Sequence, residues 1–216
     1  MSEAGIPAWE DGNWTPLPSL TSHVETDVCV VGLGGSGLTC VNALLALGKR
    51  VVGIDAGIIG GGAAGRNGGF LLAGTSEFYH DSVASLGRER AKKIYQLTVD
   101  EIERIATETP EVVRRTGSLR IAGSADEEHD IVRQLAALRA DGFGGESYDG
   151  PEGRGLLVHE DASFQPLARC RLLARKAIAA GARLFERTVG TGLSERRVET
   201  SSGGIVSCDR IVVEHR

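Results

Sequence analysis

A short glycine-rich segment, residues 32–37, has the residue spacing with the clearest chemical meaning in this chain of 216 residues. It reads Gly-Leu-Gly-Gly-Ser-Gly, with glycines at Gly32, Gly34 and Gly37. In such a spacing the first glycine permits a tight turn, the second lets the backbone approach a diphosphate, and the third lets a helix pack closely on a strand. Free N–H groups at the start of that helix attract anions. The segment therefore predicts a phosphate-binding turn.

The flanking residues predict the elements that would hold this turn in place. A β-branched run begins at Asp27, a helix is expected over 38–47, and a second apolar run, 50–54, ends on Asp55. An acidic residue about 20 positions downstream is placed to accept a hydrogen bond from a ribose hydroxyl. An Asp at this position also favours NAD or FAD over NADP, whose 2′-phosphate needs a cation. This βαβ context favours an adenine dinucleotide site over a plain glycine-rich turn.

Composition excludes several other classes of function. The net charge of −5 gives no support to nucleic-acid binding, and no apolar run is long enough to span a bilayer. The N-terminal residues lack the charged-then-apolar pattern of a secretory signal, so a cytoplasmic protein is expected. Cys29, Cys40, Cys170 and Cys208 lie far apart without a CxxC pair, which favours neither a metal site nor a disulfide. Cys29 and Cys208 have the surroundings of buried strand residues.

Hydrophobic periodicity predicts an α/β protein with an added antiparallel part. A helix is expected over 82–108, a strand near 117–122, a helix from Ser124 through 140, and a loop or pair of turns over 142–155. Pro166 suits the first turn of a helix that runs to 180. A strand-like run at 155–159 precedes this helix. Further short strand-like runs, separated by glycine-containing turns, follow it at 182–186, 189–193, 198–200 and 205–213.

Three blocks of the sequence carry a resemblance to a known family. They are Val28 to Asp55, the segment Gly60-Gly-Gly-Ala-Ala-Gly-Arg-Asn-Gly-Gly69, and Gln165-Pro-Leu through Val213. The chain resembles the FAD-dependent amine and amino-acid oxidoreductases related to D-amino-acid oxidase, glycine oxidase and sarcosine oxidase. The second block is similar to a GRNGG segment in the branch that includes the gamma-glutamylputrescine oxidases. This block is the most specific of the three, because other dinucleotide-binding proteins do not need it.

The resemblance implies FAD as the cofactor and assigns residues to it. Loops rich in free N–H groups form anion-holding concavities, so the second block also suits a diphosphate on physical grounds. Arg66 would add a cation, and Val189 matches the position whose backbone contacts the adenine; from the residues alone, Val189 reads as an ordinary core residue. The expected cofactor-binding residues are Gly32, Gly34, Gly35, Ser36, Gly37, Asp55, Ala56, Arg66, Asn67, Gly68, Gly69 and Val189.

The expected fold class is a Rossmann-like FAD-binding βαβ domain with a partial antiparallel α+β substrate domain. The expected organisation is a lead-in over 1–26, the first part of the FAD-binding domain over 27–80, a partial substrate or helical domain over 81–154, and the second part of the FAD-binding domain over 155–216. Complete family members continue for roughly as long again. The chain is therefore expected to be an N-terminal half with unpaired edges and apolar faces, which favour association with a complementary C-terminal chain.

The expected function is oxidation of a C–N bond in a small amine or amino acid to an imine, with hydride transfer to the flavin. Two alternatives remain open: a non-catalytic truncated remnant or subunit, and an NAD-dependent dehydrogenase using the same βαβ unit. No catalytic residue can be named from the sequence. His80, His129 and His159 are isolated in the sequence, which is typical of structural or solvated histidines. Covalent or non-covalent attachment of the flavin is equally open.

Overall fold

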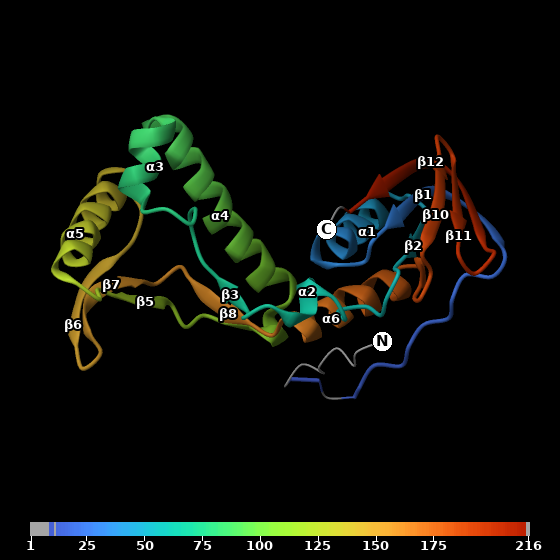
Figure 1. Ribbon diagram of the computed structural model, residues 1–216, viewed down its shortest axis with the longest axis horizontal. Helices are drawn as coiled ribbons and strands as arrows, with labels where there is room; N and C mark the ends of the chain where they lie inside the picture. The colour runs from blue at the N-terminus through green and yellow to red at the C-terminus, as the bar shows by residue number, and fades with distance from the viewer. Residues whose placement is uncertain (1–8, 11, 215–216) are drawn as a thin grey trace. The chain divides into compact units, whose positions relative to one another are not determined.

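The computed structural model describes residues 9, 10 and 12–214. The chain divides into two compact units, each with its own secondary structure (Figure 1). Unit 1 comprises Met1–Gly68 and Pro166–Arg216, and unit 2 comprises Gly69–Gln165.

Unit 1 contains a six-stranded sheet of order β10-β11-β12-β1-β2-β9 (Figure 1). Strands β12, β1, β2 and β9 run parallel, whereas β10 and β11 form an antiparallel hairpin that continues onto β12. β1 and β12 are each nine residues long and pair in parallel through eight registered residue pairs, and the strand order places both at the centre of the sheet. The strands are β1 His23–Val31, β2 Val51–Ile54, β9 Arg183–Phe185, β10 Gly190–Ser194, β11 Arg197–Thr200 and β12 Ile205–Val213.

Alternate side chains of β1 pack into two different cores, one on each face of this sheet. Val28 and Val30 pack with residues of α1 (Gly35–Ala46) and α6 (Pro166–Ala179), whereas Cys29 packs with Leu20 and residues of β11 and β12 on the other face. Successive strand side chains point to opposite faces, so the continuous apolar run of β1 is what a strand covered on both faces requires. A short helix, α2 (Ala63–Arg66), also packs against α6.

Unit 2 combines two small antiparallel sheets with three helices (Figure 1). Helix α3 packs on α4 and α5, and α5 packs on β7; Tyr79, Tyr95 and Leu138 belong to the core that these elements share. One sheet has the order β3-β8-β4 and the other β5-β7-β6. The elements are β3 Phe70–Leu71, α3 Tyr79–Leu86, α4 Arg88–Glu108, η1 Pro110–Val112, β4 Val113–Arg114, β5 Ser118–Ile121, α5 Ala125–Ala140, β6 Glu146–Gly150, β7 Gly153–Val158 and β8 Ala162–Phe164.

The predicted fold class is confirmed: unit 1 contains a mainly parallel sheet with a βαβ start, and unit 2 contains antiparallel sheets. Three predicted elements differ from the structure. The helix expected over 82–108 is two helices, because Gly87 takes a left-handed φ of 82° between α3 and α4. The loop expected over 142–155 contains strand β6, paired with β7. The strand expected from Asp27 begins at His23, within the expected lead-in, because its first residues already pair with β12.

Candidate functional site

The glycine turn joins β1 to α1 as the sequence predicts, and each of its three glycines has a steric or conformational role. Gly32 has a left-handed φ of 97°, which a side chain would strain. A Cβ on Gly37 would lie 2.0 Å from the carbonyl oxygen of Gly32, so only glycine allows α1 to start so close to β1. No side chain caps α1 at Gly34. Its first N–H groups are therefore left for a ligand or another acceptor, and Gly35 and Ser36 belong to this first turn.

The N–H groups of Gly34 and Gly37 converge on one anionic oxygen in the structure. Both donate to the same carboxylate oxygen of Glu214, at 3.0 Å and 3.3 Å. Glu214 follows β12, and its backbone N–H donates to the Val31 carbonyl at 2.9 Å, which extends the pairing of β12 with β1. The turn is thus an anion-binding concavity, and sequence reasoning missed the carboxylate that lies in it.

Asp55 lies at the carboxyl end of β2 and holds the loops on both sides of it. One carboxylate oxygen accepts from the N–H of Leu33 and the other from the N–H of Gly57, each at 2.7 Å. A carboxylate oxygen has a second lone pair, so both oxygens retain capacity to accept from a hydroxyl. Asp55 and Ala56 line the same groove as the glycine turn.

The second glycine block repeats the geometry of the first. Gly60 has a left-handed φ of 76°, and a Cβ on Gly65 would lie 2.0 Å from the Gly60 carbonyl oxygen. The loop therefore turns tightly into α2, just as the first turn leads into α1. Arg66 closes α2 and is exposed, and Asn67 caps it by donating to the carbonyl of Ala64 at 3.0 Å.

A buried carboxylate fixes this second block, and sequence reasoning missed it. Glu186 is fully buried after β9 and accepts three hydrogen bonds: from the indole N–H of Trp14 at 2.9 Å, from the N–H of Leu17 at 2.7 Å and from the N–H of Ile59 at 2.8 Å. It thereby ties the N-terminal segment to the loop before Gly60. The signal in the sequence was the Glu at the end of a predicted strand, which is unusual for a buried position.

The two glycine blocks and the ends of the parallel strands line one groove of about 600 Å³. Of the predicted cofactor residues, the groove brings together Gly32, Gly34, Asp55 and Ala56, and its edge includes Thr188 and Gly190. Val189 lies between these two residues in the chain and is 44% exposed, and it is not itself among the residues that line the groove. Gly68 ends the first segment of unit 1, and Gly69 begins unit 2.

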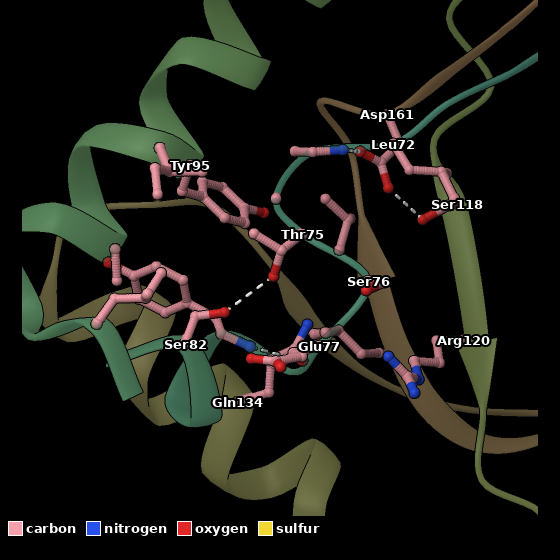
Figure 2. Close-up of a pocket in the computed structure, with 18 of the residues that line it drawn as sticks. Leu72, Thr75, Ser76, Glu77, Ser82, Tyr95, Ser118, Arg120, Gln134 and Asp161 are labelled. Carbon is pink, nitrogen blue, oxygen red and sulfur yellow. Dashed lines mark hydrogen bonds between the residues drawn. The ribbon is translucent and has the colours of Figure 1, made fainter. Parts of the chain in front are cut away.

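Unit 2 encloses a separate pocket of about 340 Å³ (Figure 2). Asp161 is buried there and accepts from the Ser118 hydroxyl at 2.5 Å and from the N–H of Ala73 at 2.7 Å. Burial raises the pKa of Asp161 despite these hydrogen bonds. Figure 2 also shows the hydroxyl groups of Thr75 and Ser82 in contact, at 2.9 Å. The pocket therefore presents an apolar wall with a few fixed polar groups.

A second carboxylate stabilises the same unit. Asp141 accepts from the phenol of Tyr79 at 2.9 Å and from the guanidinium of Arg88 at 2.7 Å. Although burial opposes ionisation, the hydrogen bonds from Arg88 and Tyr79 lower the pKa of the Asp141 carboxyl. These contacts join α3 and α4 to the end of α5.

No cluster of histidines, cysteines and carboxylates that could hold a metal occurs in residues 9, 10 and 12–214. His80 lies on α3, with its side chain 13% exposed and 3.4 Å from Asp81, whereas the His159 side chain is exposed and 3.2 Å from Glu146. His129 is a residue of α5. Within the same described residues, no helix has the length and apolarity to cross a membrane.

Comparison with known proteins assigns a family. Residues 27–213 match the family described as FAD dependent oxidoreductase. A curated relative, "Probable oxidoreductase OrdL" of Haemophilus influenzae, is 25% identical over 91% of this chain and 50% of its own length. Gamma-glutamylputrescine oxidoreductase of Escherichia coli is 37% identical over 38% of this chain and 19% of its own length. The chain thus spans about half the length of the first of these relatives.

Solved structures show the same fold. Glycine oxidase from Geobacillus kaustophilus superposes with a TM-score of 0.68 at 19% identity, over 88% of this chain and 55% of that protein. L-amino acid deaminase from Proteus vulgaris superposes with a TM-score of 0.69 at 18% identity, over 93% of this chain and 48% of that protein. The resemblance predicted from the three sequence blocks is confirmed. The match over residues 27–213 shows that the chain belongs to the FAD dependent oxidoreductase family.

Proposed function

We propose that unit 1 binds FAD and that the chain is the cofactor-binding part of an oxidoreductase that oxidises a C–N bond of an amine or amino acid to an imine. The observation that carries the proposal is the convergence of the Gly34 and Gly37 N–H groups on one anionic oxygen. A diphosphate oxygen can take the place of that carboxylate oxygen, because both are anionic acceptors of similar size. The family match favours FAD over NAD as the dinucleotide.

The residues of the groove fit an adenine dinucleotide. The turn of Gly32 to Gly37 would hold the diphosphate, and Asp55 would accept from a ribose hydroxyl. The left-handed turn at Gly60 and the close approach at Gly65 require glycine, and alanine is the largest residue from Gly60 to Gly65, so that a flat ring can approach the backbone of this loop. Arg66, which is exposed, adds a cation beside this loop. When bound, FAD supplies the acceptor for a hydride from the carbon that bears the amine.

The last three residues of the second glycine block are also proposed to contact FAD. Asn67 and Gly68 continue the loop after α2, and Gly69 follows them; we propose that their backbone lies along the cofactor, as the resemblance implies. We also propose that the Val189 backbone contacts the adenine. In the residues that the structure describes, we assign no general base, because a neutral amine can give up a hydride without one.

We further propose that unit 2 belongs to the substrate side of the enzyme. Its antiparallel sheets and its pocket provide apolar walls and fixed hydroxyl groups, which suit a small amine or amino acid. The first curated relative is about twice as long as the match. We therefore propose that turnover needs residues equivalent to the other half of that relative, in a longer form of the chain or in a complementary chain.

The test is cofactor retention followed by reduction. The purified chain is mixed with FAD, passed through gel filtration and examined by visible absorption, with NAD binding measured in parallel by the fluorescence of its reduced form, NADH. The proposal predicts flavin absorbance that co-elutes with the protein, and no comparable retention of NAD. Retention of NAD instead of FAD would support the dehydrogenase alternative, and retention of neither would contradict the proposed site.

The C–N oxidation is tested separately under anaerobic conditions. A panel of amines and amino acids is added to the FAD-loaded chain, alone and with a separately expressed C-terminal half of a family member. Bleaching of the flavin absorbance by an amine or amino acid supports the proposed reaction. Bleaching by alcohols but never by amines, in both preparations, would contradict it.

A further inference from the structure

The carboxylate of Glu214 occupies the place where the proposed FAD diphosphate would bind. One of its oxygens accepts from the N–H groups of both Gly34 and Gly37. A Cβ placed on Gly34 would lie 2.9 Å and 3.0 Å from its two oxygens, so the carboxylate covers the face of the turn that the second glycine leaves open. A diphosphate cannot use the same donors while this side chain stays there.

The backbone of Glu214 keeps the side chain close to the turn. Its N–H donates to the Val31 carbonyl at 2.9 Å, so the residue continues the alignment of β12 along β1. Its Cβ lies 3.0 Å from the position that a Cβ would take on Gly32. Rotation about the side-chain torsions of Glu214 is therefore the simplest way to move its carboxylate out of the glycine turn while β12 stays paired with β1.

Electrostatics make this contact favourable in the absence of ligand and unfavourable in its presence. The positive end of the α1 dipole and two N–H donors attract the carboxylate. Within residues 9, 10 and 12–214, no lysine, arginine or histidine forms an ion pair with Glu214 within 4.0 Å. A diphosphate arriving at the turn would meet the negative charge of Glu214 at short range, where like charges repel.

We infer that Glu214 is a built-in competitor for the diphosphate site: its carboxylate closes the glycine turn in the free chain and must leave before FAD binds. The inference rests on the proposed function, because it takes FAD as the ligand of this turn. Removing the charge, or the whole side chain, should tighten binding of FAD and of any diphosphate. Since charge-assisted hydrogen bonds and like-charge repulsion both change, the dissociation constant should fall roughly tenfold or more.

The experiment compares Glu214→Gln, Glu214→Ala and wild type by isothermal titration with FAD and, separately, with inorganic diphosphate. Glu195→Gln is the matched control, since Glu195 is an exposed glutamate between β10 and β11 in the same unit. The inference predicts a roughly tenfold lower dissociation constant for both Glu214 variants and no change for the control. Thermal melts of the free proteins check that all variants fold. If Glu214→Ala fails to fold, Glu214→Gln, which keeps the shape of the side chain, decides the outcome.

The outcomes separate this inference from the proposed function. Equal affinity of wild type and the Glu214 variants for both ligands would overturn the inference while leaving FAD binding intact. If FAD binds to none of the proteins but diphosphate binds more tightly to the Glu214 variants, the competition stands and FAD as the ligand is wrong. A second readout needs no cofactor: the amide signals of Gly34 and Gly37 in the free protein should shift in Glu214→Gln but not in Glu195→Gln. Unchanged signals would also overturn the inference.

Discussion

Replacing Gly37 by alanine tests the steric basis of the glycine turn. The added Cβ would lie 2.0 Å from the Gly32 carbonyl oxygen, whereas real Cβ contacts are no shorter than 3.0 Å, so the start of α1 must move away from β1 by about 1 Å. Overpacking of this kind costs about 1–3 kcal/mol, and the better helix propensity of alanine offsets roughly 0.5–1 kcal/mol of it. We expect Gly37→Ala to lower the free energy of unfolding by about 1–2 kcal/mol.

Gly35→Ala is the matched control, because a Cβ at Gly35 would meet no heavy atom within 4 Å. It lies two residues away in the same turn, and the change should leave stability unchanged or raise it by up to about 1 kcal/mol. Urea unfolding of the two variants and wild type measures the difference, and FAD titration should show weaker binding for Gly37→Ala, whose N–H is displaced. Equal unfolding midpoints for Gly37→Ala and Gly35→Ala would refute the reasoning.

Three further predictions concern other buried groups. Glu186→Gln places an NH2 group against backbone and indole donors and should lower the free energy of unfolding by about 2 kcal/mol. The exposed control Glu195→Gln should change it by less than about 0.5 kcal/mol. Equal urea midpoints for the two variants would contradict the role of Glu186 in holding the N-terminal segment to the loop before Gly60. The folded pKa of Asp141 lies below 3.8, so its carboxylate adds stability above that pH that is lost as pH falls through the folded pKa. The difference in unfolding free energy between wild type and Asp141→Asn should therefore shrink from neutral pH to about pH 3, and a constant difference would argue against it. Iodoacetamide at about pH 8 should label the partly exposed Cys40 but leave Cys29 of β1 unmodified, because Cys29 is fully buried and burial raises its pKa to about 12. Equal labelling rates of the two cysteines, measured by mass spectrometry, would show that β1 is not buried as described.

Sequence patterns were sufficient for the βαβ core because local and long-range requirements agree there. The β-branched run predicts the strand that leads into the three-glycine turn, and the acid ends the next strand. The structure places that acid, Asp55, beside the turn, where it accepts a hydrogen bond from the Leu33 N–H. The buried positions of Cys29 and Cys208 were predicted for the same reason and are confirmed. Periodic apolar residues likewise located α1, α5 and α6 to within a few residues of their observed bounds.

Features that depend on a distant partner could not be predicted. Strand β6 is weakly apolar, and its backbone pairing with β7 decides its conformation. Gly87 has a positive φ and separates α3 from α4, and a glycine between two apolar-periodic segments does not by itself show that the helix ends there. Glu186 and Glu214 find their hydrogen-bond donors far away in the sequence, so their roles become visible only when the strands are assembled.

The most direct test of FAD binding at the glycine turn is a backbone-amide NMR titration of the isotope-labelled chain with FAD. Binding of the diphosphate at this turn predicts saturable changes in the amide signals of Gly34 and Gly37, together with those of Leu33 and Gly57, whose N–H groups donate to Asp55. Signal changes confined to unit 2, or changes at the glycine turn that do not saturate, would contradict the claim that this turn holds the FAD diphosphate.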